Sequence, residues 1–172
     1  MRYLFDIRGF LTIYEIGDRG KGKILHADRN IITTLGRQRV AELITNMMVG
    51  GGPLPTGSFV SEMAIGDGGA PQGDLLVPIV PVLSDTALVH ELRRTAAVNP
   101  VVVGQVLTFT ASFLTASLTP IDFINPLNQV INEAGLFSGL DNRLFARKTF
   151  PSIPFSPGDR VGVIAEWSIE VL

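Results

Sequence analysis

The residues best suited to chemistry are few and widely spaced along the chain. The two histidines, His26 and His90, lie far apart in the sequence, and there is no cysteine. A zinc site needs three or four converging nitrogen, sulfur or oxygen ligands, and the histidines do not have ligand spacing. No Gly-x-Ser-x-Gly segment supports a nucleophilic serine, although a single sequence leaves a Ser-His-Asp triad open. We therefore expect neither a metal nor a cofactor.

A glycine-rich segment, Gly66-Asp67-Gly68-Gly69, superficially resembles a phosphate or calcium loop. It lacks the lysine and hydroxyl residue of a phosphate loop and the repeated aspartates of a calcium loop. Glycine adopts positive φ at little cost, so the segment predicts a tight turn.

Glu133 is the most informative acid, because it lies inside an apolar segment, residues 130–137. A buried carboxylate is costly unless it is paired. We expect a buried pair with Arg93 or Arg94 that fixes strand register. A catalytic glutamate would need a second placed group, and a glycosidase would need paired carboxylates. No spacing pairs the other acids in the middle of the chain, which are Asp67, Asp74, Asp85 and Glu91.

The elements that position these residues are mostly strands. Residues 1–29 predict a β-hairpin extension with a glycine-rich turn at 17–22, and residues 30–172 predict a β domain, the two forming a single domain over 1–172. Alternation of apolar and polar residues at 107–113 and 161–171 is typical of strands with one buried face. Many short strands separated by turns favour an antiparallel β-sandwich or partly open barrel.

One N-terminal helix interrupts the strands, over residues 34–48. Thr33 or Thr34 can cap its first free backbone N–H groups, and glycines at 50–52 end it. The apolar residues at helical spacing, which should share one face, are Val40, Leu43, Ile44 and Met47.

The composition favours assembly with other proteins. Apolar residues make up 46% of the chain and charged residues only 17%, and interface cores are similarly depleted of charge. The net charge of −2 and the scattered basic residues argue against nucleic-acid binding. The charged N-terminus and the absence of a long apolar stretch predict neither a signal peptide nor a membrane span.

Two weakly charged loops, 70–87 and 115–129, are the expected contact regions, because binding residues concentrate on loops. A monomeric domain rich in apolar residues remains the alternative to self-assembly. The predicted contact residues are Pro71, Leu75, Leu76, Pro78, Ile79, Pro81, Pro120, Ile121 and Phe123.

The order of motifs resembles the N-terminal, virion-attaching domain of phage tail-collar fibre proteins and related small phage virion structural proteins. The likeness covers roughly residues 30–172 and includes a final Trp167-Ser168-Ile169 strand. Its motifs are Ile32–Gly36, Met63–Pro71, Thr86–Glu91 with Arg93-Arg94, Asn132–Phe137 and Leu144–Arg147.

The resemblance implies a non-enzymatic tail or baseplate component or fibre adaptor, made in the host bacterial cytoplasm and located in the virion. Such fibres continue into shafts and receptor-binding tips, and residues 1–29 precede the usual start of the domain, so receptor binding is not carried over. We expect contacts with other phage tail or capsid proteins and a trimer or hexamer of the chain itself. A capsid decoration protein is the alternative, and a hydrolase acting on a host envelope polymer is a more remote one.

Overall fold

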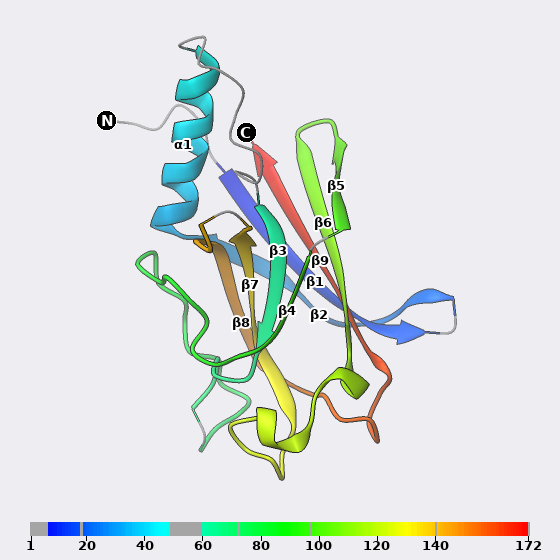
Figure 1. The fold of residues 1–172 in the computed structure, drawn as a ribbon. Helices are drawn as coiled ribbons and strands as arrows, with labels where there is room; N and C mark the ends of the chain where they lie inside the picture. Colours follow the sequence, from blue (N-terminus) through cyan, green and yellow to red (C-terminus); the bar gives the residue numbers. More distant parts are fainter. Residues whose placement is uncertain are drawn as a thin grey trace.

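A computed structural model describes residues 7–17, 19–48, 60–71, 73–96, 98–139 and 141–171. These residues form one helix, two short 3-10 turns and nine antiparallel strands in a curled half-barrel (Figure 1). The expectation of a mainly β sandwich or partly open barrel with one helix is confirmed. The elements are β1 (Ile7–Gly17), β2 (Gly20–Ile32), α1 (Thr34–Met48), β3 (Val60–Gly66), β4 (Glu91–Ala96), β5 (Val98–Val103), β6 (Val106–Leu114), η1 (Thr115–Ser117), η2 (Pro120–Asp122), β7 (Val130–Ser138), β8 (Leu144–Pro154) and β9 (Gly162–Val171).

The strand order is β4-β3-β7-β8-β2-β1-β9-β6-β5. The N-terminal hairpin therefore supplies the fifth and sixth strands of this order. β2 pairs with β1 from Asn30 to Gly20, but with β8 only through Ile31 and Ile32. Because β2 and β8 separate beyond these two residues, the sheet divides into two halves that enclose the core.

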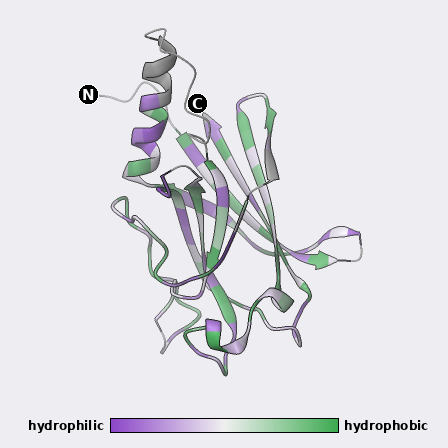
Figure 2. Cartoon of the chain, viewed as in Figure 1, coloured by the Kyte–Doolittle hydropathy of each residue, from purple (hydrophilic) through white to green (hydrophobic). Residues whose placement is uncertain are grey.

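Alternating side chains of both halves fill this core, as the sequence pattern predicts. Figure 2 shows hydrophobic and hydrophilic residues alternating along the strands. On β9 the buried positions are Val163, Ala165, Trp167 and Ile169, and on β6 they are Phe109, Ala111 and Phe113. Full burial of each large apolar side chain stabilises the fold by about 1.5–3 kcal/mol.

The helix begins where the sequence predicts. Thr33 Oγ1 accepts a hydrogen bond from the Gly36 backbone N at 3.1 Å, so Thr33 is the capping residue of the two candidates. The same hydroxyl donates to the Leu144 carbonyl at 2.6 Å, which fixes the start of α1 against β8. Val40 is partly buried against the core. The side chains of Leu43, Ile44 and Met47 lie outside the described residues.

The β-prone residues 101–114 lie in two strands, β5 and β6, which form a hairpin, and not in one continuous strand. Val103 pairs with Val106 around a two-residue turn, and Gly104 has a φ of 61°. Glycine at the first central position is typical of the tight turns that join antiparallel strands. The continuous valine-rich pattern concealed this reversal, because residues on both sides of the turn are β-prone.

Candidate functional site

Glu133 lies fully buried on β7, a strand that is buried along its whole length. Its Oε1 accepts hydrogen bonds from the backbone N atoms of Gly68 at 3.2 Å and His90 at 2.9 Å. Its Oε2 accepts from the Val89 backbone N at 3.1 Å and from Arg147 Nη2 and Nε at 2.7 and 3.2 Å. Five donors therefore surround one carboxylate, which is how a buried charge is stabilised.

Arg147 of β8 extends this contact to a second acid. Its Nη1 donates to Asp85 Oδ2 at 2.7 Å, and the Val82 backbone N donates to the same oxygen at 3.1 Å. Burial lowers the pKa of Arg147, but its hydrogen bonds to Asp85 and Glu133 outweigh burial and raise that pKa above its ordinary value. The guanidinium therefore remains charged between two carboxylates.

The prediction that Glu133 pairs with Arg93 or Arg94 is wrong. Arg94 contacts Glu91 at 2.6 Å and Glu62 at 3.3 Å and lies over the Phe137 ring, while Arg93 is exposed. The physical reason is strand order: β4 is an edge strand beside β3, and β3 separates it from β7.

A signal for the true partner was present in the sequence. Turn-forming residues at 138–142 separate the apolar segment 130–137 from the β-prone residues 143–149. Folding the chain about this turn places Arg147 near Glu133 on the same face. In the structure Arg147 lies opposite Gly135, and Thr149 lies opposite Glu133.

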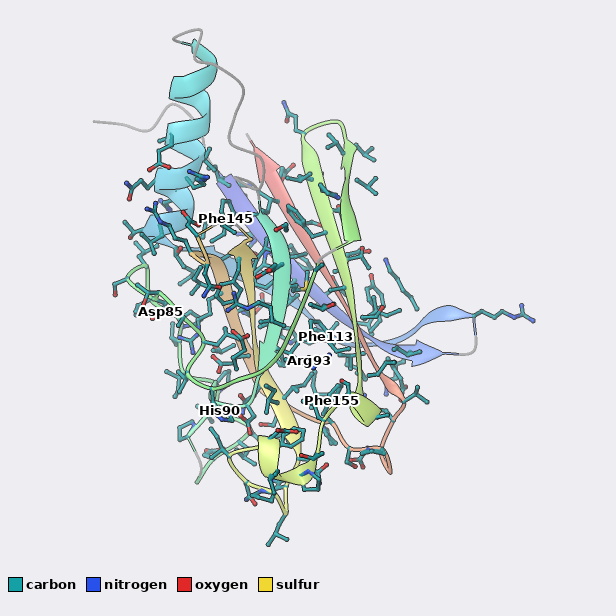
Figure 3. The ribbon with its side chains drawn as sticks, viewed as in Figure 1. Asp85, His90, Arg93, Phe113, Phe145 and Phe155 are labelled. Carbon is teal, nitrogen blue, oxygen red and sulfur yellow. The ribbon has the colours of Figure 1, made fainter. Side chains whose placement is uncertain are left out.

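The residues between β3 and β4, 67–90, form a long segment that we call the strap. It lies across the outer face of β7 and β8 (Figure 1), and Asp85 and His90 mark its upper and lower parts in Figure 3. It is held by contacts along its length: Gly69 N to Asn132 Oδ1 at 2.6 Å, Thr149 Oγ1 to the Ile79 carbonyl at 2.6 Å, Ser152 N to the Leu75 carbonyl at 3.0 Å, and Thr34 N to the Leu83 carbonyl at 2.8 Å.

Asp67, at the start of the strap, joins three segments of the chain. The side chain is buried, and its Oδ1 contacts His90 Nδ1 at 2.5 Å. Its Oδ2 accepts a hydrogen bond from the Ile124 backbone N at 2.7 Å. The carboxylate therefore connects both ends of the strap to the loop at 119–129.

The glycines around Asp67 do not adopt the positive φ expected of a tight turn. They are required instead by close packing of the strap. A Cβ at Gly69 would lie 2.3 Å from the Asn132 carbonyl oxygen, and one at Gly68 would lie 2.6 Å from Val89 Cβ. The segment binds Glu133 and Asn132 through its backbone N–H groups, and its pattern alone did not reveal this.

The strap also exposes a row of large apolar side chains, which we call the apolar ridge. Each of these residues is between 44% and 77% exposed, although its backbone is held by the contacts above. No charged residue occurs between Asp74 and Asp85. The ridge comprises Leu76, Val77, Ile79, Val80, Val82 and Leu83.

The predicted contact residues divide by burial. The prediction is wrong for Pro81 and Phe123, which are buried. Phe123 packs in the core because loop 119–129 folds back against it. Leu75 and Pro78 are partly buried. The exposed ones are Pro71, Leu76, Ile79, Pro120 and Ile121. The prediction missed Leu127, and it also missed Val77, Val80, Val82 and Leu83, which a count of consecutive uncharged residues would have included.

The acids of the site have structural partners. Asp85 and Glu133 both bind Arg147, and Asp67 binds His90 and a backbone N–H. Within the described ranges, no group of three or more histidine, aspartate or glutamate side chains could hold a metal ion. These contacts hold the strap against β7 and β8, so the side chains of the apolar ridge project from a firmly held backbone.

No helix in the part of the chain that the structure describes has the length and apolar character needed to cross a membrane. The chain matches no protein-family model, no curated protein and no solved structure.

Proposed function

We propose that this protein is a non-enzymatic structural subunit of a bacteriophage virion, a tail or baseplate component or a fibre adaptor. It docks onto a partner protein of the particle through the apolar ridge. The observation that carries the proposal is the ridge itself, in which six large apolar side chains remain in solvent on a firmly held backbone.

The energetics of the ridge favour a covered working state. Single exposed apolar residues are common on protein surfaces, whereas contiguous apolar patches mark interaction sites. Because the strap is already ordered by Glu133, Arg147 and Thr149, docking would cost little conformational entropy. A rigid, uncharged ridge is suited to stable protein contact.

The motifs that resemble the tail-collar domain support the same proposal. Four of them converge around one carboxylate: the segments beginning at Met63, Thr86, Asn132 and Leu144 all contribute to, or lie beside, the Glu133 contacts. The shared pattern therefore coincides with the residues that hold the strap and its ridge in position.

The test is incorporation into particles. Phage lacking the gene is complemented with the wild-type chain, with Val80→Asp in the ridge, or with Thr86→Asp as an exposed control on the same strap. Particles are purified by density gradient and labelled with antibody. We expect equal melting temperatures for the three proteins, and incorporation of the wild type and Thr86→Asp but not of Val80→Asp.

Each other outcome has a distinct meaning. Label at the tail tip supports the proposal, whereas label across the shell identifies a capsid decoration protein. Absence of the wild-type chain from particles contradicts a virion role, and normal incorporation of Val80→Asp contradicts docking through the ridge. Cleavage of host envelope polymers by the purified chain would contradict a non-enzymatic role.

A further inference from the structure

Among the strand edges of the described residues that no neighbouring strand covers are those of β4, β5 and part of β2. β4 and β5 are the outer strands of the sheet. β2 is unpaired on its β8 side from Gly20 to Asn30, because β8 meets it only at Ile31 and Ile32. An uncovered edge presents backbone N–H and C=O groups that can pair with another chain, so natural proteins usually protect their edges.

Two of these edges carry such protection. β4 exposes Glu91 and Arg93 to solvent. Its Arg94 forms ion pairs with Glu91 and with Glu62 of β3. β2 carries exposed Lys21 and Lys23, and its pairing with β1 is irregular at two places. Charged side chains and bulges are the usual means of preventing edge-to-edge association.

The pairing of β5 with β6 is irregular between Val98 and Val101, but the three residues that follow lack this protection. Val98–Val103 contains no charged residue, and its last three residues, Val101, Val102 and Val103, are 61%, 68% and 71% exposed. Consecutive strand residues point to opposite faces, so both faces of this segment are apolar and open. Pro100 is its only residue without a backbone N–H, and it limits the length of any added ladder.

The hairpin geometry shows which backbone groups are available. Val103 and Val106 flank the two-residue turn and Val101 lies opposite Thr108. Residues that flank such a turn direct their N–H and C=O toward each other, and alternate residues direct theirs away. Val102 therefore directs both of its hydrogen-bonding groups toward the uncovered edge.

We propose that β5 pairs antiparallel with β5 of a second copy of this chain, about a two-fold axis at Val102. When a strand pairs with its symmetry mate about a two-fold axis, the residues on the axis lie opposite their own copies. This arrangement is unfavourable for charged side chains and favourable for valines. In this register Val102 faces Val102, and Val101 of each copy faces Val103 of the other. The inference is independent of the proposed function and makes the assembly a dimer, or a hexamer that contains two-fold axes.

Cysteine cross-linking tests the register directly, because the chain has no cysteine of its own. Hydrogen-bonded antiparallel neighbours have Cα atoms about 5.5 Å apart, within the roughly 4.4–6.8 Å that a disulfide spans. We expect Val102→Cys to give a disulfide-linked dimer on mild oxidation. Arg93→Cys, at the exposed β4 edge, and Val101→Cys, displaced from the axis, are the controls and should remain monomeric on a non-reducing gel.

A charge at the axis provides the second test. Val102→Lys places two ammonium groups together across the axis, and the residue it replaces is mostly exposed, so each copy should keep its fold. By light scattering, the wild type should have an even number of copies and Val102→Lys half that number. A monomeric wild type, an unchanged mass for Val102→Lys, or equal cross-linking of Val102→Cys and Arg93→Cys would each overturn the proposal.

Discussion

Arg147 Nη2 lies 2.7 Å from Glu133 Oε2, and both side chains are almost completely removed from solvent. The pair joins β7 to β8 on the outer face of the sheet, where the strap covers it. Because Glu133 also accepts three backbone N–H groups of the strap, this ion pair connects the sheet to the segment that carries the apolar ridge. The charge of Glu133 and the position of the ridge are therefore physically coupled.

Replacing Glu133 with Gln should strongly destabilise the protein. Both carboxylate oxygens face only donors, so the NH2 group of Gln would face donors in either orientation, and Arg147 would lose a charged partner. Disruption of a buried pair typically costs about 3–5 kcal/mol. The free energy of unfolding, measured by urea denaturation, should fall by that amount.

The matched control is Glu91→Gln, which alters a partly exposed pair with Arg94. Exposed pairs contribute about 0–1 kcal/mol, so this variant should remain close to the wild type. Equal stability of Glu133→Gln and Glu91→Gln would show that the buried pair does not stabilise the fold.

Replacing Asp85 with Asn should loosen the strap without unfolding the sheet. The change removes a charged partner of Arg147, and a hydrogen bond to a charged group contributes about 1.5–3 kcal/mol. Local opening of the strap should become about 10–100-fold more frequent. Hydrogen exchange of the Val82 and Thr34 amides, which bond within or to the strap, measures this directly.

Asp74→Asn is the control for strap opening, because Asp74 is exposed and its side chain accepts a hydrogen bond from the nearby Leu76 backbone N. Its exchange pattern should match the wild type at Val82 and Thr34. If Asp85→Asn accelerated exchange throughout the core strands equally, the strap would not be a separate opening unit.

The sequence predicted those parts of the fold that depend on local periodicity. The alternation on β6 and β9, a helix start capped by Thr33 or Thr34, and the burial of Glu133 each follow from neighbouring residue types. The identity of the partner of Glu133 depends on strand order, which local patterns do not determine. Nor could they show that the strap runs across β7 and β8, because its hydrogen bonds join residues distant in sequence.

Gly36→Ala should destabilise the protein by about 1–3 kcal/mol, the usual cost of overpacking. A Cβ at Gly36 would lie 2.1 Å from the Phe145 carbonyl oxygen, so α1 would have to move away from β8. Gly73→Ala is the control, since no atom lies within 4 Å of its added Cβ. Thermal unfolding of the two variants should separate them clearly, and equal melting temperatures would contradict close packing of α1 on β8.

His26 should make stability depend on pH. Burial lowers its pKa below the ordinary 6.5, the Lys148 ammonium lowers it further, and Asp28 opposes them. As pH falls through about 6.5, the unfolded chain therefore binds a proton before the folded chain does, and stability decreases until the lowered folded pKa is reached. His26→Phe removes this titration and keeps a ring beside Phe150, whose centroid lies 5.1 Å away.

The measurement is the melting temperature of both proteins between pH 8 and pH 5. The wild type should lose stability relative to His26→Phe as the pH falls, with the difference developing below about pH 6.5. A difference between the two melting temperatures that is constant over this range would show that His26 binds protons equally in the folded and unfolded states.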